Sequence, residues 1–318
     1  MTTEPRGFVI LGFPRSGTTL LSRLLDAHPD VSCPPETYLL SSAARFLYEQ
    51  KDVEGPPVGV VSGLGFLGFG AEDVMAPLRD MVFDFYRKIA GDASVWVEKT
   101  AIDVFHLEVL EPFLAGHVRF ILLTRHPLDV VGSNMDLAEV MGAQLTDIHA
   151  LTKDVNSPHE GLARAWINRA EALKGFAERN AGTCLQLRYE DLLESPDATL
   201  EKLWQFMGLK ADAAALRREA FVRVPQVGLG DYKVNATTDI QPLKKNGWRK
   251  KIPPAALSRI VPLLAPMMER LGYEVPRVPK PLAREDAVRQ FTMAANLKRD
   301  MSRAASDGDG GGDGGTKP

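Results

Sequence analysis

Apolar residues along the chain fall into short β-rich runs and longer stretches with helical spacing. The run Gly7–Phe13 (GFVILGF) is apolar throughout, which is typical of a strand buried on both faces. Further strands are predicted at Val95–Glu98, Arg119–Leu123 and Thr183–Tyr189. Because helical patterns separate these runs, the sequence predicts an α/β protein whose central, mostly parallel sheet is flanked by helices.

The helical stretches carry apolar residues at intervals of three and four. Thr18–Ala27 follows the first strand closely, so the chain opens as strand, loop and helix. Further helices are predicted at Ile102–Leu114, Leu128–Met141, Gly161–Arg179 and Leu200–Met207, and from Pro253 to about Leu271. The Gly-rich stretch Gly55–Gly70 is predicted to be a loop, either a lid or binding loop or a tolerated surface insertion.

The composition divides the chain into one domain and a tail. Residues 1–305 are predicted to form a single domain, with a charged helix of unknown docking at Arg284–Arg303. The tail Ser306–Pro318 is rich in Gly and Asp and has no apolar residue, so it is expected to be disordered.

Composition and charge are typical of a soluble globular protein. Of the 318 residues, 45% are hydrophobic and 25% charged, and the formal net charge of −3 argues against a broad nucleic-acid or membrane surface. No apolar run approaches the roughly 20 residues of a membrane span, and no signal peptide is evident. Cys33 and Cys184 fit two free thiols in a reducing cytosol and no metal site, so a cytoplasmic location is expected.

A glycine-containing loop joins the first strand to the first helix. Its sequence, Gly12–Thr19 (GFPRSGTT), has the G-x-x-x-x-G spacing of a phosphate loop, with Thr18 where a P-loop nucleotide hydrolase has its Lys. The glycines let the backbone approach an anion, and the helix N-terminus points N–H groups at it. The predicted ligands are Arg15, Ser16, Gly17, Thr18 and Thr19. The alternative is a merely structural turn between strand and helix.

Two blocks resemble the sulfotransferases that use 3′-phosphoadenosine-5′-phosphosulfate (PAPS). The loop Gly12–Thr19 resembles their 5′-phosphosulfate loop, and Phe120–Ser133 (FILLTRHPLDVVGS) resembles their 3′-phosphate element. The resemblance implies that Arg125 and Ser133 bind the 3′-phosphate. It also implies a P-loop NTPase-like sulfotransferase fold, with PAPS as co-substrate, the 3′,5′-bisphosphate PAP as product, and no metal. Taken alone, Arg125 follows a buried strand, where open α/β sheets bind ligands, but it could also cap a helix or pair with Asp129.

The motifs are most similar to the tyrosylprotein sulfotransferase branch. The similarity is clearest at Leu25–Thr37 and Gly247–Tyr273, extends over residues 7–275, and is weak in 40–95. That branch is Golgi-anchored and has disulfides, features that this sequence does not show.

The branch resemblance implies a base and a stabilising cation. Glu36 maps to the catalytic base, since an attacking neutral hydroxyl must lose its proton. Lys99 maps to the residue that stabilises the transferring group, and Arg15 is expected to face the same developing charge. Taken alone, Glu36 could cap a helix, and Lys99 could pair with Glu98 or Asp103.

Several other residues have two possible roles each. Tyr189 could contact the adenine or ribose, or be a core tyrosine. Trp248 and Arg249 lie in a basic segment that could close over the 3′-phosphate, or be a solvated charge run. His106 is available as the base used by other cytosolic sulfotransferases, although its apolar neighbours favour packing. His126 could touch the nucleotide or be structural.

The sequence thus predicts an enzyme that moves a sulfuryl group from PAPS to an acceptor hydroxyl. The acceptor is a peptidyl tyrosine or, alternatively, a small molecule, lipid or glycan. A P-loop kinase is disfavoured by the missing Gly-Lys-Ser/Thr triplet, and a non-catalytic nucleotide-binding module by the presence of Glu36 and Lys99. No nucleic-acid partner and no membrane span are expected, and a homodimer is possible.

Overall fold

The fold is built on five parallel strands. The structure, a computed structural model, describes residues 6–50, 58–141, 152, 155–222, 239–240, 247–278 and 293. The strands lie in the order β2-β3-β1-β4-β5. They are β1 (Arg6–Leu11), β2 (Val31–Ser32), β3 (Val95–Glu98), β4 (Val118–Thr124) and β5 (Cys184–Arg188). The predicted α/β class with a parallel sheet is confirmed.

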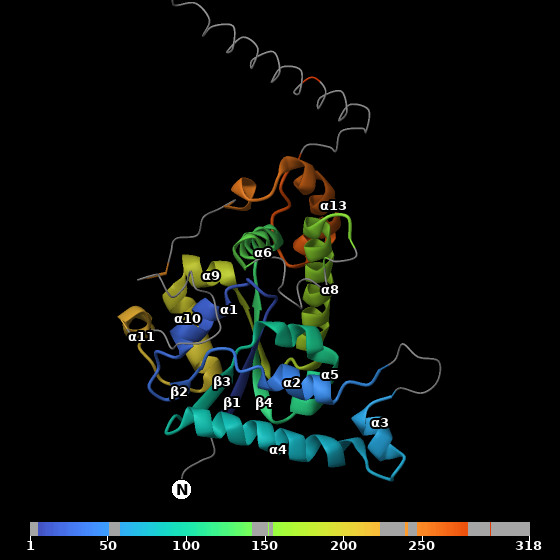
Figure 1. Cartoon of the computed structure of the whole chain (residues 1–318). Helices are drawn as coiled ribbons and strands as arrows, with labels where there is room; N and C mark the ends of the chain where they lie inside the picture. The colour runs from blue at the N-terminus through green and yellow to red at the C-terminus, as the bar shows by residue number, and fades with distance from the viewer. Residues whose placement is uncertain are drawn as a thin grey trace, which may run out of the picture.

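Helices cover both faces of this sheet (Figure 1). The α-helices are α1 (Thr18–Leu25), α2 (Leu39–Phe46), α3 (Val60–Gly65), α4 (Ala71–Ala90), α5 (Leu107–Leu114), α6 (Pro127–Met141), α8 (Pro158–Arg179), α9 (Tyr189–Glu194), α10 (Pro196–Met207), α11 (Ala213–Val222) and α13 (Pro254–Arg270). Two 3₁₀ helices are η1 (Ala101–His106) and η2 (Gly247–Lys250).

The continuous apolar run of β1 serves both layers of the core. Val9 and Leu11 pack with residues of α2, α4, α5 and α8, whereas Phe8 and Ile10 pack with residues of α1 and α10. Successive side chains of a strand point to opposite faces, so a strand covered on both faces needs apolar residues at every position.

The connections place a topological switch point at the carboxyl end of β1. β3 and β4 follow one another in the chain but pair with opposite edges of β1. Crossovers that leave in opposite directions open a crevice at this point, and open α/β sheets bind ligands there. The loop predicted to bind phosphate, residues 12–17, begins at this crevice.

Three local predictions were wrong. The segment 102–114 is not one helix, because its first part winds as the 3₁₀ helix η1. The predicted loop Gly55–Gly70 contains α3, followed by the unpredicted α4. Tyr189 opens α9 instead of ending a strand. The predicted tail Ser306–Pro318 lies outside the described residues, as does the predicted helix Arg284–Arg303 except for Met293.

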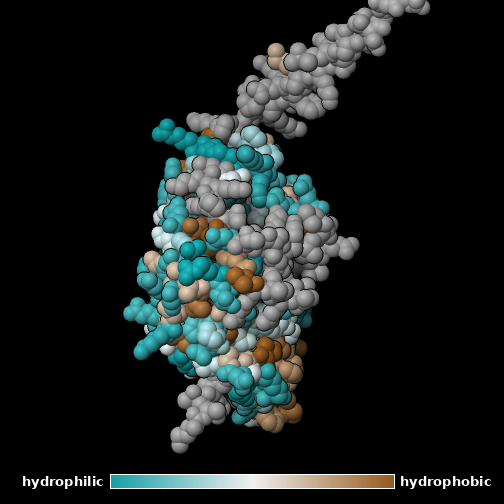
Figure 2. Space-filling view, turned by 90° about the vertical axis from the view of Figure 1, so that its left-hand side faces the viewer, coloured by the Kyte–Doolittle hydropathy of each residue, from teal (hydrophilic) through white to brown (hydrophobic). Residues whose placement is uncertain are grey.

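Exposed large apolar side chains gather in one part of the described chain. Most lie between Phe46 and Ile89, including Phe66, which is 81% exposed. On the face seen in Figure 2, hydrophobic residues form small separate areas among hydrophilic ones. Within the described ranges, no helix is both long and apolar enough to cross a membrane.

Candidate active site

The loop after β1 has the geometry of an anion cradle. Its tight turn is closed by the Ser16 N–H, which donates to the Phe13 carbonyl at 2.9 Å. Arg15 and Gly17 have φ values of 74° and 97°, the left-handed region that a non-glycine residue seldom adopts. Ser16 is only 1% exposed, and its hydroxyl has no hydrogen-bond partner among the described residues. A buried donor left open beside a helix N-terminus fits a bound anionic oxygen.

Arg15 joins this loop to the second predicted phosphate element. Its Nε donates to the Ser133 hydroxyl at 3.1 Å, and its carbonyl accepts a bond from the Arg125 guanidinium at 3.0 Å. Asn134, which the sequence analysis missed, donates to the Pro14 carbonyl at 3.2 Å. The structure therefore brings the two predicted phosphate-binding elements together. The available signal was that Asn134 directly follows the second block, which ends at Ser133.

Tyr189 packs against both elements. Thr124 pairs with Arg188 in the sheet, so Arg125 and Tyr189 leave neighbouring strands at the same level. The Arg125 guanidinium lies 4.3 Å from the centre of the Tyr189 ring. A Cβ added to Gly17 would lie 2.2 Å from that ring. The aromatic ring thus requires glycine at this turn of the phosphate loop.

The segment after β4 continues into a stack of rings. Trp248 is 1% exposed and lies parallel to His126, with 6.4 Å between ring centres. The Arg249 guanidinium lies over the Trp248 ring, 4.5 Å from its centre. Burial, followed by the charge of Arg125, lowers the pKa of His126 to about 4. His126 is therefore neutral at neutral pH, and the structure places Trp248 in the core, with Arg249 at the surface above it.

Glu36 and Lys99 form an ion pair on the other side of β1. The Lys99 ammonium donates to Glu36 Oε1 at 3.1 Å, and the Lys99 side chain is 1% exposed. The Tyr38 hydroxyl donates to Glu36 Oε2 at 3.2 Å. Both oxygens of the predicted base are thus engaged. His106 is the last residue of η1.

Two buried carboxyl groups beside this pair were not predicted as site residues. Glu98 is fully buried, and burial raises its pKa against the opposing effect of its hydroxyl partners. Asp103 is also fully buried, and burial followed by the charges of Glu98 and Glu36 raises its pKa well above its ordinary value. The signal for Glu98 was a charged residue inside an otherwise buried strand.

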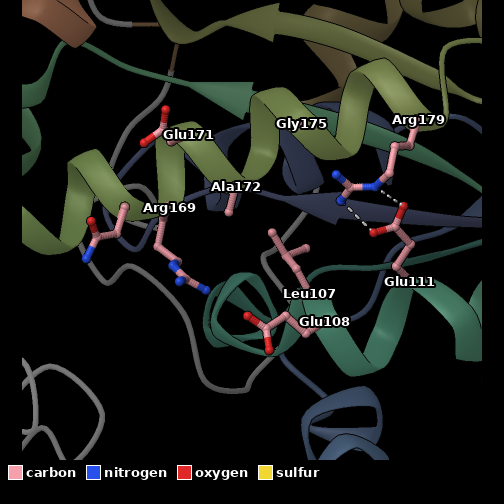
Figure 3. A pocket seen from close by; sticks show the side chains of 9 residues that line it. Leu107, Glu108, Glu111, Arg169, Glu171, Ala172, Gly175 and Arg179 are labelled. Carbon is pink, nitrogen blue, oxygen red and sulfur yellow. Dashed lines mark hydrogen bonds and ion pairs between the residues drawn. The ribbon is translucent and has the colours of Figure 1, made fainter.

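A polar pocket lies apart from these residues, between α5 and α8 (Figure 3). Its volume is about 340 Å³, and Arg179 closes one end by two hydrogen bonds to Glu111 at 2.9 and 2.7 Å. None of the predicted site residues lines it. Among the residues that the structure describes, no cluster of three or more metal-binding side chains occurs.

Comparison with known proteins gives consistent matches. A sequence model described as the sulfotransferase family matches residues 6–213. The chain is 26% identical over 282 residues to protein-tyrosine sulfotransferase 1 of Danio rerio, covering 86% of this chain and 74% of the relative. It is 27% identical over 283 residues to nodulation protein NoeE of Sinorhizobium fredii, covering 83% of this chain and 65% of the relative.

Solved structures share the fold. The sulfotransferase domain of the curacin biosynthetic pathway has a TM-score of 0.57 at 20% identity, covering 86% of this chain and all of that domain. The sulfotransferase domain of the Synechococcus PCC 7002 olefin synthase has a TM-score of 0.57 at 23% identity, covering 86% and 97%. At these identities the likeness concerns the fold alone.

Proposed function

This chain belongs to the sulfotransferase family, and we propose that it transfers the sulfuryl group of PAPS to the phenolic hydroxyl of a peptidyl tyrosine. PAPS-dependent sulfuryl transfer follows from the family. The acceptor and the residue roles are our proposal. The observation that carries it is the Glu36–Lys99 ion pair, which lies at the carboxyl end of β3, beside the strand that leads into the anion cradle.

The donor would be held at its two charged ends. The backbone of the loop 12–17 and the open hydroxyl of Ser16 suit the 5′-phosphosulfate, with Thr18 and Thr19 at the start of α1. Arg125 and Ser133 suit the 3′-phosphate, and the Tyr189 ring offers a surface for the base or ribose.

The reaction needs a base and stabilisation of the departing charge. The acceptor oxygen attacks sulfur, its proton passes to Glu36, and the bond from sulfur to the 5′-phosphate oxygen of PAP breaks. Negative charge grows on that oxygen, and the cations Arg15 and Lys99 are the groups proposed to face it. Before the reaction, Lys99 holds the Glu36 carboxylate in place by a charge-assisted hydrogen bond.

A phenolic acceptor is supported by the sequence relatives. Relatives with similar sequences over most of the chain are named protein-tyrosine sulfotransferases. To test the acceptor, the enzyme is incubated with labelled PAPS and a tyrosine-containing peptide, with the Phe variant of the peptide as control. Label in small molecules but never in peptide would overturn the acceptor class.

Donor binding is tested separately. PAP or PAPS should raise the thermal midpoint without added metal, and adenosine 5′-phosphosulfate, which lacks the 3′-phosphate, should raise it much less. Equal shifts with both nucleotides would refute the roles of Arg125 and Ser133. Arg125→Met should remove the advantage of the 3′-phosphate selectively.

We also propose a cytoplasmic location. Cys33 and Cys184 are both free thiols, as expected of a chain kept in a reducing compartment. Fractionation of the producing cells, with the chain detected by antibody, tests the proposal, and recovery outside the cytoplasm would refute it.

A further inference from the structure

Glu98 connects the two chain segments that carry the proposed catalytic pair, Glu36 and Lys99. It ends β3, directly before Lys99, and is fully buried. Its Oε2 accepts a hydrogen bond from the Thr37 hydroxyl at 2.6 Å, and its Oε1 accepts one from the Thr100 hydroxyl at 2.5 Å. One carboxylate therefore binds the residue after Glu36 and the residue after Lys99.

The two hydroxyls extend this link into the backbone. Thr100 Oγ1 accepts a bond from the Tyr38 N–H at 3.2 Å, and Thr37 Oγ1 accepts one from the Leu39 N–H at 3.2 Å. Tyr38 has a φ of 58°, a left-handed conformation that is unfavourable for a side chain of its size. Such a conformation persists where its surroundings hold it, and here the bonds traced back to Glu98 do so.

We propose that Glu98 is a positioning residue that holds the Glu36 turn against the Lys99 strand end through the hydroxyls of Thr37 and Thr100. The inference rests on the proposed role of Glu36 as base. Glu36 itself lies in no helix or strand, so its chain segment needs another anchor. The 3.1 Å contact between Lys99 and Glu36 is the geometry that this anchor maintains.

A carboxylate suits this position because both partners donate. Each threonine hydroxyl uses its proton toward Glu98 and a lone pair toward a backbone N–H. A glutamine would offer one accepting oxygen and one NH₂ donor. One of the two threonine hydroxyls could then no longer donate to residue 98. The amide should therefore break one of the two hydrogen bonds while keeping the shape of the side chain.

The test compares Glu98→Gln with paired changes of the threonines. At saturating donor, Glu98→Gln should lower kcat by about 10- to 100-fold, as expected for a small misplacement of reacting groups, while PAP affinity changes less than about twofold. Thr100→Val should lower kcat similarly, and Thr100→Ser, which keeps the hydroxyl, should restore it. As a control, Thr183→Val removes a hydroxyl directly before the amino end of β5, where it donates to the Asn180 carbonyl, and should leave kcat unchanged.

A double variant separates positioning from general destabilisation. In a Glu36→Gln background the base is already missing, so Glu98→Gln should lower kcat little further. A full additional loss there, or wild-type kcat in Glu98→Gln, would overturn the inference while leaving the base assignment intact. Wild-type kcat in Glu36→Gln would instead refute the proposed function. If Glu98→Gln does not fold, Thr37→Val against Thr37→Ser decides by the same criteria.

Discussion

Gly17→Ala should disrupt the phosphate loop for two separable reasons. The φ of 97° at this position is unfavourable for alanine by about 1–2 kcal/mol. The new Cβ would also lie 2.2 Å from the Tyr189 ring, and forcing extra volume into a packed site typically costs about 1–3 kcal/mol. We therefore expect Gly17→Ala to lower the free energy of unfolding by about 2–5 kcal/mol and to weaken PAP binding.

Removing the ring isolates the two contributions. In a Tyr189→Ala background the three atoms nearest the added methyl group are removed with the ring, so mainly the backbone contribution of about 1–2 kcal/mol should remain. Urea unfolding of wild type, both single variants and the double variant gives the coupling free energy between the two sites. An equal loss from Gly17→Ala in both backgrounds would refute the steric reasoning. Restored PAP binding in the double variant would show that the Tyr189 ring transmits the damage.

Three further outcomes are expected. The pKa of His126 is about 4 in the folded chain, against 6.5 for the free group, so the unfolded chain binds this proton more tightly. The free energy of unfolding should therefore fall by up to about 3 kcal/mol as the pH drops from 6.5 to 4. His126→Phe should lack this part of the acid sensitivity in denaturant titrations, and identical pH curves would contradict it. Glu36→Gln should lower kcat by about 10²–10⁴-fold with PAP affinity nearly unchanged, whereas loss of activity only in His106→Ala would move the base to that residue. Arg15→Ala should lower kcat more than PAP affinity, and weaker binding at unchanged kcat would make it an anchor only.

The sequence predicted the elements whose apolar residues follow a regular pattern. β1 is recognisable because both its faces are covered, and the helix α8 because one apolar stripe faces the core. The helix α4 was missed because it contains Pro77, a residue that disfavours a helix interior, and because Met81 and Phe85 are apolar yet 52% and 46% exposed. Exposed apolar residues blur the helical period on which such a prediction depends.

The site could be predicted where short motifs carry it. The loop at Gly12–Thr19 and the strand end at Arg125 are local patterns, and the structure brings them together. The hydrogen bonds of Glu98 to Thr37 and Thr100 could not be predicted, because Thr37 lies 61 residues from Glu98 in sequence and contacts it only in the folded chain. Thr37, Glu98 and Thr100 follow no periodic pattern in the sequence that would indicate their contact.

The hydrogen bonds between Arg15 and the second phosphate element connect the two proposed halves of the donor site directly. The Arg15 Nε donates to Ser133, and its carbonyl accepts from Arg125, so displacement of the loop alters both groups of the second element. We therefore expect occupancy of one subsite by an anion to change the affinity of the other, and linkage requires the same factor in either order of binding. Inorganic sulfate and adenosine 3′-monophosphate, each filling one half of the site, should therefore each bind with an affinity that depends on the presence of the other.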